Sequence, residues 1–292
     1  MEPEIATSAA PRSAQVPLAV RLHLGRAAVQ TIAHRVGADL LHIKGDTVDP
    51  TLRPGRPAGS DVDVLVRPAH VVVLDSALRR HGWSVYSTFR GGSPFGHAQT
   101  YRHDVWGYLD LHRFFPGIEL DAASAFARLW RDRASVTFGG VACAVPGVAA
   151  QATILAVNAA RAGAYARTEV DQMWRDATPR LRAAIDREVR ALDARLAFDA
   201  AFGELERHRG ARTYRLWKAV SDGGGRAEEW WGRLRASRGI REAFDVLVLA
   251  PQVNTEVLSH RLGRTPTRSD VIGEFFRRPL RGARRIGTRH RR

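Results

Sequence analysis

The pattern of apolar and polar residues changes near residue 146. Before that point, short apolar runs alternate with segments of helical periodicity, which is typical of a sheet with flanking helices. We therefore expect an α+β fold over residues 18–146, with a mixed β-sheet. The expected strands are 40–43, 61–66, 83–89, 97–102 and 105–114, with a hairpin over 134–145. The expected helices are 18–36, 68–81 and 119–131.

After Pro146, apolar residues recur mainly at helical spacing, which predicts a helical domain over residues 147–263. Its expected helices are 147–163, 178–208, 213–222, 227–237 and 241–249. Residues 1–17 contain Pro, Ser and Ala without a period, and we expect them to be disordered. Residues 264–292 form an arginine-rich tail.

Two acidic residues alternate with valines in the expected strand 61–66. Successive strand residues point to opposite faces, so Asp61 and Asp63 share one face and Val62 and Val64 share the other. Two carboxylates this close repel each other unless a cation lies between them. Carboxylate oxygens are the ligands that Mg²⁺ prefers. The pattern predicts a divalent metal site, and the alternative is a solvated acidic strand face.

A third carboxylate is found in the expected strand 105–114. Asp110 lies between two leucines, and His112, two residues later, shares its face. If this strand lies beside 61–66, Asp110 joins the other two aspartates, and such a group can hold one or two Mg²⁺ ions. These ions bridge nucleotide phosphates and stabilise a leaving pyrophosphate. The alternatives are a salt bridge from Asp110 to an arginine and an ordinary packed role for His112.

Three motifs occur in order: Ile43-Lys44-Gly45, then Arg56-Pro57-Ala58-Gly59-Ser60-Asp61-Val62-Asp63, then Leu109-Asp110-Leu111-His112. Together they resemble the nucleotidyltransferase superfamily of the DNA polymerase β palm type. The chain is most similar to a largely uncharacterised bacterial branch of it, and the resemblance covers roughly residues 18–160. It implies a palm-like mixed sheet followed by a helical domain.

The resemblance also implies roles for individual residues. Asp61, Asp63 and Asp110 would bind Mg²⁺, with Mn²⁺ as the alternative ion, and Asp110 would also act as the base toward the acceptor hydroxyl. The position of His112 on the same strand face as Asp110, rather than the resemblance, makes it a candidate to contact and orient Asp110. The backbone at Gly45 would approach the triphosphate. The residues expected to contact phosphate oxygens are Lys44, Arg56 and Ser60.

Two positions depart from the superfamily pattern. Gly45 is followed by Asp46, whereas members of the superfamily usually have Gly or Ser there, and an acid at this place would repel phosphate. Asn158 occupies a place where relatives often have a histidine.

Composition narrows the classes of function. The single cysteine, Cys143, excludes an intrachain disulfide and a cysteine-based zinc cluster. No apolar run approaches the roughly 18 residues of a membrane span, and no signal peptide is recognisable, so we expect a cytoplasmic protein with no membrane partner. The formal net charge is +15, and residues 264–292 hold ten arginines and two acids. This excess favours RNA or another polyanion as a partner.

We therefore expect a nucleotidyltransferase that moves a nucleoside monophosphate from an NTP, such as ATP, to an acceptor hydroxyl. The acceptor stays open among small molecules, peptides or proteins, and RNA. One alternative is a non-catalytic member of the same fold that binds a nucleotide or nucleic acid. Another is a regulatory module that acts through the arginine-rich tail.

Overall fold

The computed structural model describes residues 16–53, 59–89, 95–162, 164–223 and 226–237, with short stretches between 239 and 273. Several expectations fall outside the described residues. They are the disorder of residues 1–15, the phosphate contact of Arg56, the helix at 241–249 and most of the arginine-rich tail.

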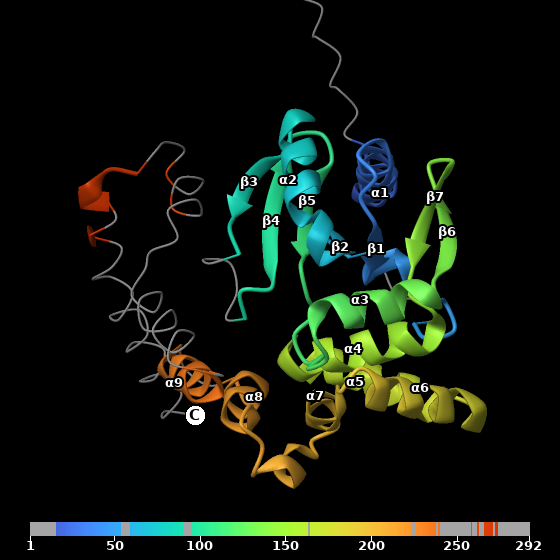
Figure 1. The fold of residues 1–292 in the computed structure, drawn as a ribbon, viewed down its shortest axis with the longest axis vertical. Coiled ribbons are helices and arrows are strands. Elements are labelled where there is room, and N and C mark those ends of the chain that lie inside the picture. The colour runs from blue at the N-terminus through green and yellow to red at the C-terminus, as the bar shows by residue number, and fades with distance from the viewer. Residues whose placement is uncertain are drawn as a thin grey trace, which may run out of the picture.

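A five-stranded mixed sheet forms the centre of the first half (Figure 1). The strand order is β1-β2-β5-β4-β3; β2 and β5 pair in parallel, and every other neighbouring pair is antiparallel. The α+β fold class is thereby confirmed, as are the five expected strands, with ends shifted by a few residues. The strands are β1 Leu40–Ile43, β2 Val62–Val66, β3 Ser84–Ser87, β4 Ala98–His103 and β5 Gly107–His112.

Helices α1 (Leu18–Arg35) and α2 (Val71–Arg80) cover one face of this sheet. Val62, Val64 and Val66 point toward them into one hydrophobic cluster, as the alternation in the sequence predicts. Leu65 points to the opposite face, into a second cluster that contains Leu41 and Ile43. The valine face of β2 is therefore sealed by helices, and its other face is left to form the site.

The remaining elements of the first half lie around this core. Helix α3 (Ala122–Arg131) begins at Asp121, whose side chain accepts a hydrogen bond from the Ser124 backbone nitrogen at 3.0 Å. The hairpin β6 (Ala134–Phe138) and β7 (Val141–Val145) is a separate two-stranded sheet packed against α1. Short 3₁₀ turns cover Gly45–Thr47 (η1) and Pro68–His70 (η2).

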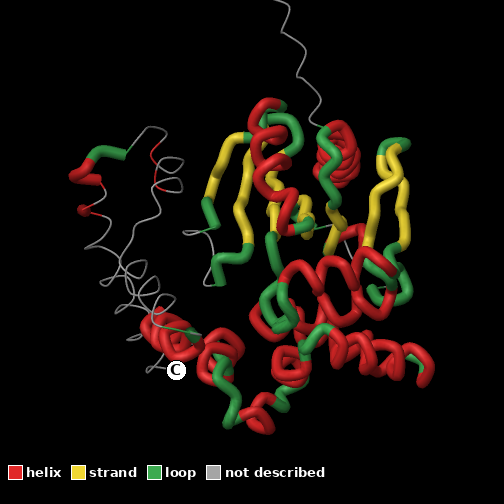
Figure 2. The backbone as a smooth tube through the Cα atoms, viewed as in Figure 1, coloured by secondary structure: helices red, strands yellow, loops and turns green. Residues whose placement is uncertain are grey.

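Figure 2 shows the later helices gathered at one end of the strands. The expectation of one helix over 178–208 is wrong, because the chain turns at Asp193, which adopts a φ of 50°, and again at Gly203. A further helix, at 164–176, was not expected. The helices are α4 Val148–Ala162, α5 Ala164–Asp176, α6 Pro179–Ala191, α7 Arg195–Ala201, α8 Tyr214–Ser221 and α9 Arg226–Ala236, with a 3₁₀ turn η3 at Leu205–His208.

Helix α4 joins the two halves. Its residues Ile154 and Val157 belong to the cluster that holds Leu41 and Ile43 of β1 and Trp217 of α8. The proposed domain boundary at 146 stays a prediction. Among the described residues, every helix is too short or too polar to cross a membrane.

Candidate active site

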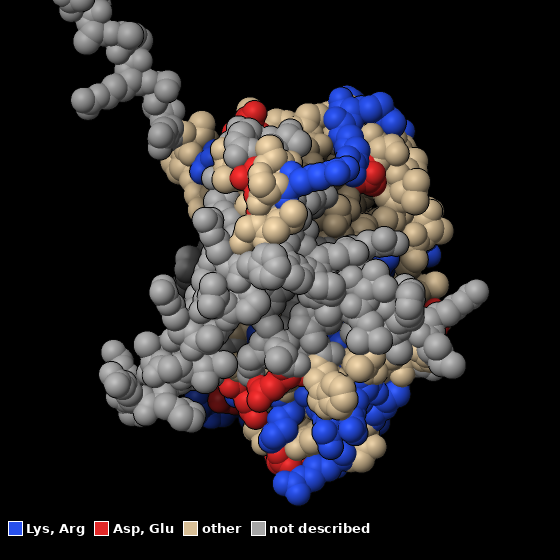
Figure 3. Space-filling view, turned by 90° about the vertical axis from the view of Figure 1, so that its left-hand side faces the viewer, with Lys and Arg blue, Asp and Glu red and all other residues tan. Residues whose placement is uncertain are grey.

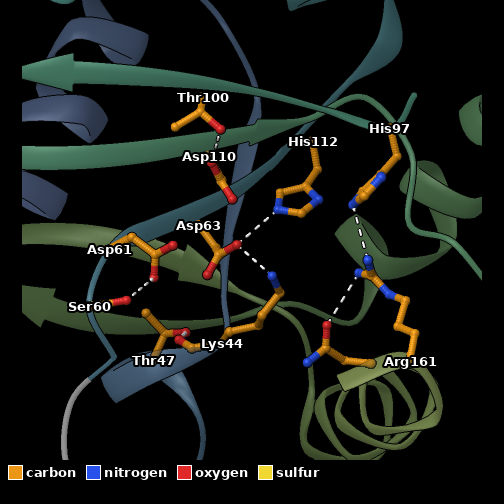
Figure 4. Close-up of polar contacts among 11 residues, drawn as sticks. Lys44, Thr47, Ser60, Asp61, Asp63, His97, Thr100, Asp110, His112 and Arg161 are labelled. Carbon is orange, nitrogen blue, oxygen red and sulfur yellow. Dashed lines mark hydrogen bonds and ion pairs between the residues drawn. The ribbon is translucent and has the colours of Figure 1, made fainter. Parts of the chain in front are cut away.

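Three aspartates of the sequence motifs lie near one end of the paired central strands (Figure 4). Asp63 of β2 is directly opposite Asp110 of β5, and Asp61 immediately precedes β2. Because paired residues of neighbouring strands point to the same face, the two carboxylates face the same side of the sheet. The adjacency of these strands, which the sequence analysis required, is observed.

Asp63 is the most buried of the three, with 7% of its surface exposed. Its Oδ1 accepts hydrogen bonds from Lys44 Nζ at 2.5 Å and from His112 Nε2 at 2.8 Å. Burial alone would raise the pKa of Asp63, but the charge of Lys44 and the bond from His112 outweigh it and hold that pKa well below its usual range. The carboxylate is therefore a permanent negative charge at neutral pH.

Asp61 and Asp110 have different surroundings. Thr100 Oγ1 donates a hydrogen bond to Asp110 Oδ1 at 2.6 Å. Burial raises the pKa of Asp61 to about 6; the charges of Asp63 and Asp110 add to this rise, and Lys44 opposes it. A carboxyl group with such a raised pKa marks a concentration of negative charge, which a divalent cation would relieve.

The donor set fits a hard divalent cation. Asp63, Asp110 and His112 each offer a ligand atom, and these atoms lie within 4.8 Å of one another. The carboxylate oxygens suit Mg²⁺ or Mn²⁺, whereas an imidazole nitrogen is a ligand that softer ions such as Zn²⁺ prefer. His112 Nδ1 is also buried and has no hydrogen-bond partner among the described residues. The predicted set of Asp61, Asp63 and Asp110 thus gains His112 as a candidate ligand, while the role of each residue stays a prediction.

The expected partner of His112 was wrong in one respect. Its hydrogen bond goes to Asp63 on the neighbouring strand and not to Asp110 on its own strand. Side chains two residues apart on one strand project side by side from the same face. The ring of His112 therefore reaches the diagonal position on the neighbouring strand, that of Asp63, more readily than it reaches Asp110.

The Lys44-Gly45 turn has an unusual backbone. Lys44 has φ 64° and ψ −178°, and Gly45 has φ 58°. A Cβ atom on Gly45 would meet Arg26 Nη2 at 2.7 Å, so the Arg26 guanidinium would have to shift, and the positive φ would strain any residue other than glycine. The hydroxyl of Thr47 donates to the Lys44 carbonyl at 2.6 Å and holds the turn. The structure therefore directs the Lys44 ammonium at Asp63 through a strained backbone.

Arg26 also explains the departure at Asp46. Its guanidinium, 1% exposed, lies 3.1 Å from the Asp46 carboxylate. Because Arg26 pairs with Asp46, the negative charge that should repel phosphate is largely offset. Of the other predicted phosphate contacts, Ser60 lies next to Asp61, with its hydroxyl 3.4 Å from Oδ1, and Arg56 is outside the described residues.

Several polar groups at the site were not identified from the sequence. Arg161 of α4 approaches His97 Nε2 at 3.4 Å and donates to Asn158 Oδ1 at 3.2 Å. The ring of His97 lies 5.1 Å from that of His112. The place of Thr100 at the site could have been predicted from the sequence, because the alternation of its strand puts it on the face of Asp110, with which it pairs. Arg161 had no such signal.

A cavity of about 110 Å³ lies beside Lys44, whose ammonium contacts Asp63. It lies between the loop after β1 and helices α4 and α5, and Lys44 lines its edge. Arg53 and Glu169 form an ion pair there at 3.3 Å. The other lining residues are Leu52, Leu155, Asn158, Ala159, Ala166, Val170 and Met173. The cavity is thus mainly apolar with a few polar groups, a composition typical of small-molecule sites.

Solved structures that resemble this chain include two with nucleotidyltransferase or adenylyltransferase names. No protein-family model matches the chain, and no curated protein matches it. One structure is the lincomycin-bound lincosamide antibiotic adenylyltransferase LnuA, with 13% identity, a TM-score of 0.34, and 59% of this chain and 95% of that chain covered. The other is an antigenic nucleotidyltransferase-like protein from Paracoccidioides brasiliensis, with 16% identity, a TM-score of 0.34, and 60% and 93% covered. Similarity at this level carries no information on the substrates of this chain.

Proposed function

We propose that this protein is a metal-dependent nucleotidyltransferase that moves a nucleoside monophosphate from an NTP to an acceptor hydroxyl. The observation that carries the proposal is the direct pairing of Asp63 with Asp110 across two parallel strands, with Asp61 beside them. A protein with no use for a cation would gain nothing from placing the carboxylates of Asp63 and Asp110 where their charges add to the raised pKa of Asp61.

Asp61, Asp63 and Asp110 would hold the divalent cation, with His112 either as a further ligand or as the group that orients Asp63. When bound, such an ion supplies Lewis-acid stabilisation of the charge that develops on the phosphate oxygens. Lys44 adds a positive charge that is already fixed against Asp63. The turn at Gly45 and Asp46 borders this point, with the charge of Asp46 offset by Arg26.

Asp110 is the proposed base. In the transfer step, the acceptor oxygen bonds to the α-phosphorus while the bond from that phosphorus to the pyrophosphate oxygen breaks. The hydroxyl proton passes to Asp110, whose Oδ1 is already engaged by Thr100. Its other oxygen has no hydrogen bond among the described residues and is the proposed proton acceptor.

The cavity beside Lys44 is the proposed place of the nucleobase; at about 110 Å³ it is smaller than the roughly 300–1,000 Å³ of a typical ligand site and would take only that part of the nucleoside. Its apolar walls from Leu155, Ala159 and Val170 suit the faces of a nucleobase, and Asn158 with the Arg53–Glu169 pair supplies polar groups for its edge. A nucleoside there would leave its phosphates near Lys44 and the carboxylates.

The class of the acceptor is a separate question, and a polyanion such as RNA is one candidate. Figure 3 shows Lys and Arg side chains at both ends of the molecule, and acidic side chains lie among those at the helical end. Basic residues of the described part also form ion pairs with acidic ones: Lys218 lies 2.8 Å from Glu206, and Arg128 contacts Glu188. A basic contact with RNA would therefore depend mainly on residues 264–292, most of which lie outside the described residues.

The test is a transfer assay with the four α-³²P-labelled NTPs, in Mg²⁺ or Mn²⁺, against host lysate separated into small-molecule, protein and RNA fractions. We expect one NTP to label one fraction, and the Asp110→Asn variant to leave it unlabelled. The labelled fraction identifies the acceptor class.

Thermal stabilisation by the same NTPs separates the enzyme from a non-catalytic binding protein. Stabilisation by an NTP and Mg²⁺ without label transfer to any fraction would favour the binding protein. If no NTP produced either stabilisation or transfer, both the enzyme and the binding protein would be refuted.

A further inference from the structure

Arg161 carries a positive charge into the interior beside the site. It projects from the last turn of α4, and Figure 4 shows its side chain reaching toward His97. The guanidinium carbon lies 5.5 Å from the ring centre of Phe115 and 5.9 Å from that of Phe95. Its Nε is buried and has no hydrogen-bond partner among the described residues.

The direct polar neighbours of Arg161 are not acids. Asn158 offers a carbonyl oxygen 3.2 Å from one Nη, and His97 offers a ring nitrogen 3.4 Å from the other. Within the described part of the chain, no carboxylate lies within ion-pairing distance of the Arg161 guanidinium. Asp63 and Asp110 act on it only through their more distant charges.

Arg161 is partly buried, and a partly buried cation without an ionic partner is costly to fold. Burial lowers the pKa of Arg161 to about 10, and Asp63 and Asp110 only partly oppose that change. Other arginines of this chain show the usual solution: Arg67, which also lies over an aromatic ring, that of Phe126, is held by Asp39 at 2.7 Å. Among the described residues, the positive charge of Arg161 therefore has no anionic group close enough to neutralise it.

The charge balance of the site shows when an anion would be needed. In the protein alone, Lys44 and Arg161 face the carboxylates of Asp61, Asp63 and Asp110, so negative charge is in slight excess. One divalent cation at the carboxylates reverses that balance and leaves the neighbourhood of Arg161 positive. An anion is then favoured on the Arg161 side of the site.

We propose that Arg161 is a phosphate-binding residue, whose guanidinium takes the pyrophosphate end of the NTP once the carboxylates hold a metal ion. This inference rests on the proposed function for the identity of the anion. A planar guanidinium matches two phosphate oxygens better than a lysine ammonium would. The proposal also accounts for Asn158, which holds one Nη of Arg161 and so orients the fork.

The test measures binding of inorganic pyrophosphate by the full chain at fixed Mg²⁺, by calorimetry and by thermal shift. The variants are Arg161→Met, Arg161→Lys and the matched control Arg67→Gln, which changes an arginine over a ring that already has a carboxylate. We expect Arg161→Met to weaken pyrophosphate binding by roughly tenfold to hundredfold, Arg161→Lys to weaken it less, and Arg67→Gln to leave it unchanged.

The stability of the ligand-free variants distinguishes a binding role from a structural one. If Arg161 serves a ligand, Arg161→Met removes an unpaired buried charge, and its melting temperature in the absence of pyrophosphate equals or exceeds that of the wild type. A structural role predicts the reverse: a lower melting temperature with a preserved pyrophosphate affinity. That result, no binding by the wild type, or failure of both variants to fold would overturn the proposal.

The two proposals can fail separately. Nucleotide transfer by the wild type, with normal pyrophosphate affinity in Arg161→Met, would leave the proposed function standing and refute the role of Arg161. Pyrophosphate binding that depends on Arg161, without transfer of any NTP, would retain the phosphate site and refute the transferase.

Discussion

Thr100 donates a hydrogen bond of 2.6 Å to Asp110, its direct partner across the antiparallel pair of β4 and β5. The bond fixes one carboxylate oxygen and so sets the direction of the other. A base that must meet an acceptor hydroxyl within hydrogen-bonding distance depends on such orientation.

We therefore expect two levels of damage at this pair. Asp110→Asn removes the base and a candidate metal ligand, and a loss of several kcal/mol of transition-state stabilisation corresponds to roughly a thousandfold lower rate. Thr100→Val only frees the carboxylate, so we expect a loss of about tenfold to hundredfold. Steady-state rates of NTP transfer and melting temperatures check this, with near-normal melting temperatures in both. Equal rates for Asp110→Asn and the wild type would contradict the assignment of the base.

His112 provides a prediction on metal affinity. Its ring, 1% exposed, donates a hydrogen bond to Asp63 at 2.8 Å. Removing a group that hydrogen-bonds to a metal ligand typically lowers the affinity for the metal by about 10–100-fold. We expect His112→Leu to raise the Mg²⁺ concentration for half-maximal transfer by that factor, and His112→Gln, which can still donate, to raise it less. Metal titrations at saturating NTP measure the effect. An unchanged midpoint in both variants would limit His112 to packing.

Much of the sheet and of the acidic cluster could be predicted because both depend on local patterns. Alternation places Asp61, Asp63 and the valines of β2 on opposite faces without any knowledge of distant contacts. The pairing of Asp63 with Asp110 needs only that their strands be neighbours, and the order of motifs supported this.

Other features depend on contacts between distant parts of the chain, for which the sequence has no local signal. Arg26 lies under Gly45 although 19 residues separate them along the chain, and Arg161 reaches His97 across 64 residues. The turn that ends α6 uses Asp193 at positive φ, where a glycine would have signalled a break. Helix α5 is a different case: Ala166, Val170 and Met173 recur at helical spacing, so the sequence did contain a signal for it, and the prediction missed it.

The buried His42 gives a prediction on stability against pH. Burial, with a smaller effect of Arg26, lowers the pKa of His42 to about 3 from its usual 6.5. The unfolded chain binds a proton in this interval and the folded chain does not, so His42 contributes stability that is complete above pH 6.5 and is lost as the pH falls toward 3. The expected slope is about 1.4 kcal/mol per pH unit.

Urea denaturation at pH 4, 5, 6 and 7 measures that slope. His42→Gln keeps a donor for Gln30 Oε1, which His42 Nε2 contacts at 3.1 Å, and does not titrate. We expect its free energy of unfolding to depend less steeply on pH than that of the wild type, by the slope of one histidine. Parallel pH profiles for the two proteins would show that His42 is already accessible to protons in the folded state.

The ion pair under the Lys44-Gly45 turn predicts a large effect on stability. Asp46→Asn would leave Arg26 buried without a carboxylate, and breaking such a pair costs about 3–5 kcal/mol. Because Asp46 is partly exposed, we expect the lower end, about 3 kcal/mol, in the free energy of unfolding. The double variant Arg26→Met/Asp46→Asn removes the unpaired charge and should recover part of the loss. A double variant less stable than Asp46→Asn would contradict a purely electrostatic cause.

The cavity beside Lys44 gives the last prediction, which separates the nucleoside from its phosphates. Ala159 of α4 lines the cavity and is buried, so Ala159→Leu extends an apolar side chain into space that we assign to the nucleoside. A filled pocket should exclude the nucleoside while leaving Arg161 and the carboxylates in place. We expect the KM for the NTP to rise at least tenfold, equivalent to about 1.4 kcal/mol of binding, with unchanged affinity for pyrophosphate and Mg²⁺.

Competition binding with a nucleoside, an NTP and pyrophosphate checks this expectation on one protein sample. The variant should lose the nucleoside and retain pyrophosphate, because the two ligands would occupy separate parts of the site. If Ala159→Leu weakened pyrophosphate and NTP equally, the substitution would have disturbed α4 and the residues that it carries. If it weakened neither, the nucleoside would have to lie elsewhere, and the open side of Asp61 would be the next place to probe.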